Sequence, residues 1–246
     1  MYIKLYLKGN FTVLYRGGIS IKYLLWDFDN TLAYRDGMWG STLCELIQEH
    51  CDYEFQIETI QPYLKTGFPW NTPQTPHNVF FESKSWWDFM TDFFVGILME
   101  VGFEERIASV ISRDVRNKYL DKNKWHVYDD SAFCLEEAKR KGYSNIILSN
   151  HVPELEELVI NLGIRDYFIK VFSSANLGYE KPNINIYKNV LFELNEAESV
   201  TMIGDNYEAD VQGALDAGID AILVRKSNTR NYGKYFNSLQ ELAGYL

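Results

Sequence analysis

Short apolar runs that end in polar residues recur along the chain from Ile21 onward. Val, Ile and Leu predominate in these runs, and segments with helical apolar spacing separate them. This pattern is typical of parallel strands whose two faces are both covered by helices. The runs are IKYLLWD (21–27), SNIILSN (144–150), YFIKVFSS (167–174), SVTMIGD (199–205) and DAILVRK (220–226).

The segments between the runs carry helix-boundary residues. SAFCLEEAKRKG ends in basic residues and Gly142, and PELEELVINLG begins with Pro153 and ends at Gly163. ADVQGALDAG likewise ends at Gly218. Proline in the first turn and glycine after the last turn are common at helix ends. The alternation of strand and helix predicts an α/β fold with a doubly wound, Rossmann-like parallel sheet.

Residues 36–126 interrupt this alternation. They contain five of the six tryptophans, a proline-containing loop at 66–78, and helix-like apolar spacing in 83–102 and 104–120. We therefore expect an α-helical cap domain at 36–126, inserted into a core domain formed by 21–35 and 127–246. Residues 1–20 are expected to be an N-terminal extension, either a small hairpin about Gly9 and Asn10 or an irregular segment.

Composition and charge narrow the class of protein. The formal net charge is −10, which argues against a nucleic-acid partner or an anionic membrane surface. The three cysteines show no zinc-type spacing, and no apolar run approaches the roughly 20 residues that a membrane span needs. We expect a soluble cytoplasmic enzyme, monomeric or homodimeric.

Polar side chains follow the apolar runs, where ligands bind in open α/β sheets. They are carboxylates, hydroxyls, an amide and an amine, a set suited to magnesium-dependent phosphoryl transfer. The candidates are Asp27, Asp29, Thr31, Ser149, Asn150, Lys181, Asp205 and Asp210.

Asp27 and Asp29 suit two different tasks in such a reaction. A carboxylate such as Asp27 can form an acyl-phosphate, which splits one difficult displacement into two easier ones. Asp29, two positions on in an extended chain, points to the same side and can protonate the leaving oxygen. Mg²⁺ would offset the phosphate charge, with Asp205 as a further ligand. Lys181 and Ser149 would hold the remaining phosphate oxygens.

This set resembles the haloacid dehalogenase superfamily of phosphohydrolases. Its four motifs occur in order as DFDNT, LSN, EKPN and GDNYEAD. The resemblance implies a helical cap of the C1 type, because the long insert lies between the first and second motifs. The run MIGDNYEADVQGALDAGIDAILV looks most like the branch of nucleotidases and acylneuraminate phosphatases.

The resemblance also implies roles for the candidate residues. Asp27 would be the nucleophile and a metal ligand, Asp29 the acid/base that also gives the metal its backbone carbonyl, and Asp205 the third protein ligand. Asp210 would orient Lys181 or metal-bound water. We also expect Thr31, Ser149, Asn150 and Lys181 to bind the substrate phosphate.

Simpler interpretations exist for each motif alone. An Asp pair often ends a strand, Ser149 and Asn150 could cap the following helix, and Lys181 could be a surface turn residue. The aromatic residues of the insert are more often core than substrate contacts, with Trp39 and Trp70 the better candidates for contact. Tyr34 and Arg35 fit a specificity role and a solvated hinge equally well, while His77, His126 and His151 are interpreted as ordinary polar residues.

The leading hypothesis is a Mg²⁺-dependent phosphatase for a small phosphorylated metabolite, such as a nucleotide or a sugar phosphate. A phosphomutase would use the same motifs, and a non-catalytic phosphate-binding protein would be expected to lack one of the catalytic groups. Asp29 argues against dehalogenation, since dehalogenase relatives lack that second aspartate.

Overall fold

The computed structural model describes residues 5–7, 10–12, 21–52, 54–77, 83–194 and 197–246. Its centre is a six-stranded parallel sheet in the order β10-β9-β8-β3-β6-β7. The strands are β3 (Ile21–Trp26), β6 (Tyr143–Ser149), β7 (Phe168–Ser173), β8 (Ala197–Gly204), β9 (Asp220–Val224) and β10 (Tyr235–Phe236). The predicted α/β parallel-sheet fold is confirmed, and the short β10 is an addition to the predicted strands.

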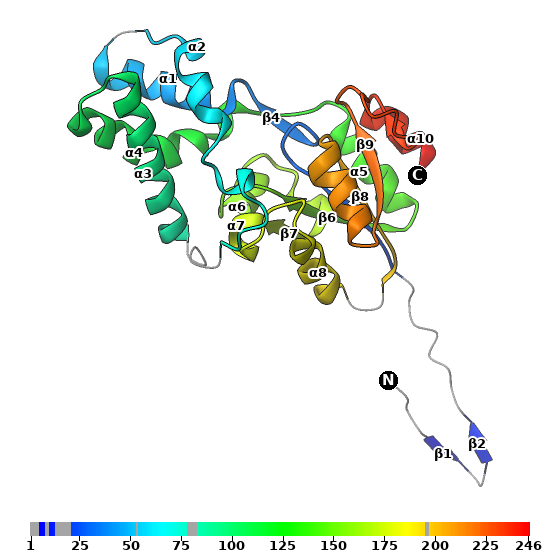
Figure 1. The fold of residues 1–246 in the computed structure, drawn as a ribbon. Helices are drawn as coiled ribbons and strands as arrows, with labels where there is room; N and C mark the ends of the chain where they lie inside the picture. The colour runs from blue at the N-terminus through cyan, green and yellow to red at the C-terminus, as the bar shows by residue number, and fades with distance from the viewer. Residues whose placement is uncertain (1–4, 8–9, 13–20, 53, 78–82, 195–196) are drawn as a thin grey trace.

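Alternate residues of β3 face opposite sides of the sheet, as the period of a strand requires. Leu24 and Trp26 belong to one buried cluster, and Tyr23 and Leu25 belong to a second. Apolar side chains of α5 (Ser131–Arg140), α6 (Leu155–Asn161) and α10 (Leu239–Tyr245) join the first cluster. Those of α8 (Ile184–Glu193) and α9 (Gly213–Asp216) join the second. Both faces of the sheet are therefore covered, as Figure 1 shows.

The insert is helical throughout much of its length and lies to one side of the sheet (Figure 1). Its helices are α1 (Met38–Cys51), α2 (Ile57–Ile60), α3 (Ser83–Val101) and α4 (Glu105–Tyr119), with 3₁₀ turns at Gln61–Lys65, Pro69–Asn71 and Lys122–Lys124. The long α3 and α4 fall where helical spacing predicted them.

Two short strands connect the insert to the sheet region. β4 (Ala33–Arg35) and β5 (Trp125–Val127) pair antiparallel, with Tyr34 opposite His126. The chain thus enters and leaves the insert side by side. Arg35 is buried and donates from Nε to the Thr42 hydroxyl at 3.1 Å, so it is a packed residue of this connection.

The segment ADVQGALDAG differs from the predicted regular helix. The chain forms a π-helical turn at Tyr207–Gln212 before α9 begins. Two further short elements, a 3₁₀ turn at Arg165–Tyr167 and α7 (Ser174–Leu177), flank β7.

At the N-terminus, β1 (Leu5–Leu7) and β2 (Asn10–Thr12) pair antiparallel. This is the pairing expected of a hairpin, while its turn and residues 1–4 and 13–20 lie outside the described residues. Across the described part of the chain, no helix has the length and apolar character to cross a membrane.

Candidate active site

Asp27 lies directly beyond the end of β3, where its backbone N–H donates to the carbonyl of Ile203 on β8 at 2.8 Å. A tight turn follows: the amides of Thr31, Leu32 and Ala33 all point to the carbonyl of Phe28. This turn keeps both aspartates of the first motif at the carboxyl edge of the sheet.

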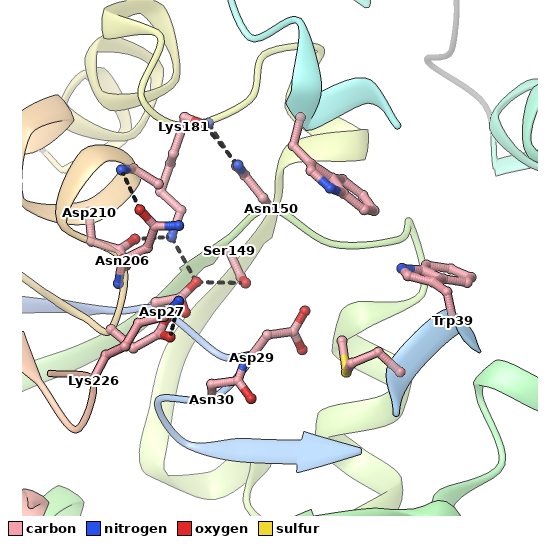
Figure 2. A pocket seen from close by; sticks show the side chains of 14 residues that line it. Asp27, Asp29, Asn30, Trp39, Ser149, Asn150, Lys181, Asn206, Asp210 and Lys226 are labelled. Carbon is pink, nitrogen blue, oxygen red and sulfur yellow. Dashed lines mark hydrogen bonds and ion pairs between the residues drawn. The ribbon is translucent and has the colours of Figure 1, made fainter. Parts of the chain in front are cut away.

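The Asp27 carboxylate is buried and has three side-chain donors. Ser149 Oγ donates to Oδ1 at 2.9 Å, Lys181 Nζ donates to the same oxygen at 2.7 Å, and Thr31 Oγ1 donates to Oδ2 at 3.2 Å. Figure 2 shows the Ser149 and Lys181 bonds converging on Asp27. The structure thus brings together residues from three of the four sequence motifs.

Lys181 is held in a network of acceptors. Its ammonium group also donates to Asp210 Oδ1 at 2.6 Å and to the Leu148 carbonyl at 2.9 Å. Burial alone would lower the pKa of Lys181, but Asp210 and Asp27 raise it above its usual range, so the side chain is charged. A buried cation paired in this way places a fixed positive charge at the floor of the pocket.

Asp205 and Asp210 come from the end of β8 and the turn after it. The carboxylates of Asp27, Asp205 and Asp210 each place an oxygen within 4.8 Å of the others. Glycine is required at 204, because a Cβ there would overlap the Asp210 carboxylate. Burial, and next the charge of Asp27, raises the pKa of Asp205 to about 6. Both causes disfavour the charged form of the Asp205 carboxyl.

Asp29 points away from Asp27 and toward the side of the pocket lined by Trp39 (Figure 2). Burial is the largest cause that raises the pKa of Asp29 well above its usual range, and the charges of Asp27 and Asp205 act in the same direction. A raised pKa favours the protonated carboxyl, which is the form that a general acid needs.

Two predicted phosphate-binding residues are already engaged with protein groups. Thr31 is fully buried and does not line the pocket, so its hydroxyl faces Asp27 instead. The Asn150 amide lines the pocket, yet it accepts from Lys181 N–H at 2.7 Å and donates to the Lys181 carbonyl at 2.9 Å. In this arrangement Asn150 fixes the backbone that carries Lys181.

The pocket has a volume of about 290 Å³. Its floor is the polar cluster, and Met38, Trp39 and Trp70 of the insert line its other side. Trp39 packs face to face on Tyr119, with ring centroids 3.8 Å apart, and Trp70 stacks on Phe68 at 4.7 Å. The insert therefore contributes an aromatic wall over the carboxylates.

Sequence reasoning missed three residues near the site. Lys226, after β9, lines the pocket and lies 3.3 Å from Asp205, and Asn206 lines it beside Asp205. His151 is buried and lies 3.7 Å from Asp29. Lys226 lies at the end of a predicted strand, and this position could have identified it as a site residue. For His151 the only such feature was its position directly after the second motif.

Tyr34, Arg35, His77 and His126 do not line the pocket. Tyr34 instead packs its ring near those of His126 and Tyr128, with centroids 5.2 Å and 4.8 Å away. His77 contacts the Pro69 carbonyl through Nε2 at 3.0 Å. These contacts fit structural roles.

The chain is similar to several known proteins. The chain is 35% identical over 104 residues to glyceraldehyde 3-phosphate phosphatase of Methanothermobacter thermautotrophicus, covering 42% of the chain and 46% of that protein. It is 23% identical to pyrimidine 5'-nucleotidase PynA of Streptococcus pneumoniae, covering 86% of each. The first of these matches therefore spans less than half of its relative.

Among solved structures, the HAD-hydrolase YfnB of Bacillus subtilis, bound to magnesium, has the same fold. The TM-score is 0.66 at 18% identity, and the match covers 92% of this chain and 99% of the other. Residues 21–218 match the family described as haloacid dehalogenase-like hydrolase, which takes in β3, the insert and all four motifs. The predicted family is thereby confirmed, and the chain belongs to the haloacid dehalogenase-like hydrolases.

Proposed function

We propose that the protein is a Mg²⁺-dependent phosphatase that hydrolyses a small phosphomonoester through an aspartyl-phosphate on Asp27. The observation that carries the proposal is the convergence of Ser149, Lys181 and Thr31 on the Asp27 carboxylate at the floor of the pocket. A nucleophile held this way has a fixed position, which is the main requirement for in-line attack on a phosphoryl group.

The residues present suit a magnesium ion. Mg²⁺ prefers oxygen ligands and is usually held by one or two carboxylates together with substrate phosphate. Asp205 Oδ2 contacts Lys226 at 3.3 Å, whereas both Asp210 oxygens already accept hydrogen bonds, from Lys181 and from the Asn206 N–H. Both Asp27 oxygens accept hydrogen bonds as well, so this difference alone does not choose the ligands. The family resemblance assigns Asp27, Asp205 and the Asp29 carbonyl to the metal, and Asp210 to Lys181. When bound, the ion would offset the repulsion between the phosphate and Asp27.

The proposed reaction uses two displacements at phosphorus. An Asp27 oxygen bonds to phosphorus as the phosphorus–oxygen ester bond breaks, and Asp29 gives its proton to the departing alkoxide. Asp29, now a carboxylate, takes a proton from water while that water attacks the acyl-phosphate. Inorganic phosphate leaves, and Asp27 and protonated Asp29 are restored. Lys181 stabilises the negative charge on the phosphoryl oxygens throughout.

We further propose that residues 36–126 act as a cap over a core formed by 21–35 and 127–246. The supporting observations are the paired connections β4 and β5 and the aromatic wall that the insert adds to the pocket. A cap that closes over bound substrate excludes water and favours small molecules over phosphoproteins. The relatives are named for glyceraldehyde 3-phosphate and for pyrimidine nucleotides, which are small phosphomonoesters.

The test is phosphate release from a panel of nucleoside monophosphates, sugar phosphates and phosphoglycolate, with Mg²⁺ and with excess EDTA. We expect turnover of at least one compound with Mg²⁺ and none with EDTA or in Asp27→Asn. Asp166→Asn, at the 3₁₀ turn before β7, is the matched control and should retain activity. Isomerised phosphate ester without free phosphate would indicate a mutase, and binding without either product would indicate a non-catalytic protein.

A further inference from the structure

His151 is a buried histidine that the proposed reaction does not use. It follows β6 directly after Ser149 and Asn150, and its side chain is inaccessible to solvent. Its backbone is held from two sides: the N–H donates to Ser174 Oγ at 3.2 Å, and the carbonyl accepts from Ser173 Oγ at 2.6 Å. The backbone of His151 is therefore anchored at the end of β7.

Aromatic side chains surround most of the ring, and polar groups act on it at two points. Phe28, Trp125 and Tyr119 surround it, with ring centroids 5.6, 5.7 and 5.9 Å away. One is the backbone of Val152, which acts against the lowering of the His151 pKa by burial. The other is Asp29, whose Oδ1 lies 3.7 Å from His151 Nε2. An imidazole ring has at least one N–H in every protonation state, and Asp29 is the acceptor that faces Nε2.

The facing side-chain atoms of this pair lack hydrogen bonds. Asp29 Oδ1 and His151 Nε2 are buried atoms without a hydrogen-bond partner in the described part of the chain. Buried polar atoms are rarely left this way, because each unsatisfied group costs about 1–3 kcal/mol. The 3.7 Å gap is longer than a hydrogen bond but too short to hold a water molecule between the two atoms. A shift of less than an ångström would join them.

We propose that His151 positions Asp29, by donating a hydrogen bond from Nε2–H to Oδ1 so that the other carboxyl oxygen faces the pocket. This inference rests on the proposed role of Asp29 in proton transfer. Asp29 is part of the pocket lining while its Oδ1 is buried against the histidine, so the two oxygens already differ in exposure. A carboxyl held by one oxygen presents the other to the leaving group in a single orientation.

The aromatic residues around His151 also connect it to the insert. Tyr119, which lies against His151, is the same residue on which Trp39 of the pocket wall stacks. Trp125 belongs to β5, the strand by which the chain returns from the insert. His151 therefore lies where the sheet, the insert and Asp29 meet.

The kinetic test compares His151→Leu and His151→Gln. Leucine removes the donor, whereas the glutamine amide can place an N–H near the position of Nε2. With an alkyl phosphate, which needs a protonated leaving group, we expect His151→Leu to lose about 10- to 100-fold in kcat. With nitrophenyl phosphate the loss should be less than about threefold, because that leaving group needs little protonation. His151→Gln should stay within about threefold of wild type on both.

Val152→Ala is the matched control, since Val152 is the next residue and fully buried. It should lower stability without changing the ratio of the two rates. Equal losses on both substrates in His151→Leu would overturn the proposal, as would no rescue by His151→Gln. Asp29→Asn is measured with the same two substrates. Whether its loss of activity depends on the leaving group tests the proposed function separately.

A second measurement does not depend on activity. ¹⁵N NMR of histidine-labelled protein reports which ring nitrogen carries the proton, and His151→Gln assigns the resonance. We expect the proton on Nε2 of His151 and a changed Nε2 resonance in Asp29→Ala. A proton on Nδ1 alone, or an Nε2 resonance unaffected by Asp29→Ala, would overturn the proposal even in a protein without detectable turnover.

Discussion

The ammonium group of Lys181 lies 2.7 Å from the carboxylate of Asp27, although 154 residues separate them in the chain. The side chains of both are almost completely buried. Lys181 reaches this point because Asn150 holds its backbone through two hydrogen bonds. The pair therefore contributes both to the floor of the pocket and to the stability of the fold.

Lys181→Met is expected to cost about 3–5 kcal/mol in the free energy of unfolding, because it leaves Asp27 and Asp210 buried without a cation. Activity should be lost as well. Urea denaturation at neutral pH gives the stability. Lys170→Met removes an exposed pair with Glu193 and should cost less than about 1 kcal/mol, so a similar loss in both variants would contradict this assignment.

Asp205→Asn is expected to weaken Mg²⁺ binding by at least about tenfold and to reduce activity in parallel, because it removes a ligand and a negative charge from the cluster. Titration calorimetry measures the affinity. Asp220→Asn, at an exposed pair with Lys234, should leave it unchanged. Unchanged affinity in Asp205→Asn would mean that the metal is bound elsewhere.

Glu180 predicts a pH dependence of stability. Burial raises the pKa of Glu180 to about 7 from an ordinary value near 4.5, so the folded protein favours the protonated carboxyl. The stabilisation is complete below the unfolded pKa and is lost as the pH rises toward 7 and above.

Glu180→Gln resembles the protonated form at every pH. Its stability should equal that of wild type near pH 4 and exceed it at pH 8, by at most about 3 kcal/mol. Thermal or urea unfolding of both proteins across this range provides the measurement. A stability difference that does not change with pH would show that Glu180 does not titrate in this range.

Trp70→Ala is expected to raise KM about three- to tenfold for the best substrate with little change in kcat, since an aromatic contact contributes about 0.5–1.5 kcal/mol. Trp70 is preferred to Trp39 because Trp70 is only partly buried, whereas Trp39 is buried and supports the fold. Trp86→Phe, in the buried cluster and outside the pocket lining, should leave KM unchanged. An unchanged KM in Trp70→Ala would show that the aromatic wall does not contribute to substrate binding.

The sequence predicted most of the sheet because its strands contain apolar runs, which are buried on both faces in much of β3, β6 and β9. The same pattern predicted Asp27 and Asp205, since they directly follow β3 and β8. The π-helical turn at Tyr207–Gln212 was not, because its apolar spacing resembles that of an ordinary helix.

Sequence patterns also could not predict contacts between distant segments. Asn150 looks like a free pocket group in its motif, yet its side chain makes two hydrogen bonds with the backbone of Lys181, which the fold brings beside it. In the sequence, His151 resembles any polar residue after a strand. Only the fold shows that Phe28, Tyr119 and Trp125 enclose it. Burial by residues far apart in the chain determines these roles.

The last prediction separates Asp27 from Asp29. Asp27→Asn removes the attacking oxygen, so no phosphoryl group should become attached to the protein and turnover should disappear. Asp29→Asn keeps the nucleophile but can neither protonate the leaving oxygen nor activate the water that breaks the acyl-phosphate. A proton-transfer group contributes about 10²- to 10⁴-fold, so the loss should be large with alkyl phosphates and smaller with nitrophenyl phosphate.

With nitrophenyl phosphate the first displacement remains possible in Asp29→Asn while the second is slow, so phosphorylated Asp27 should accumulate. Intact-protein mass after rapid quench should show one added phosphoryl group in Asp29→Asn and none in Asp27→Asn. The double variant is the control and should also show none. An adduct that persists in Asp27→Asn, or equal losses on both substrates in Asp29→Asn, would mean that the two aspartates do not divide attack and proton transfer in this way.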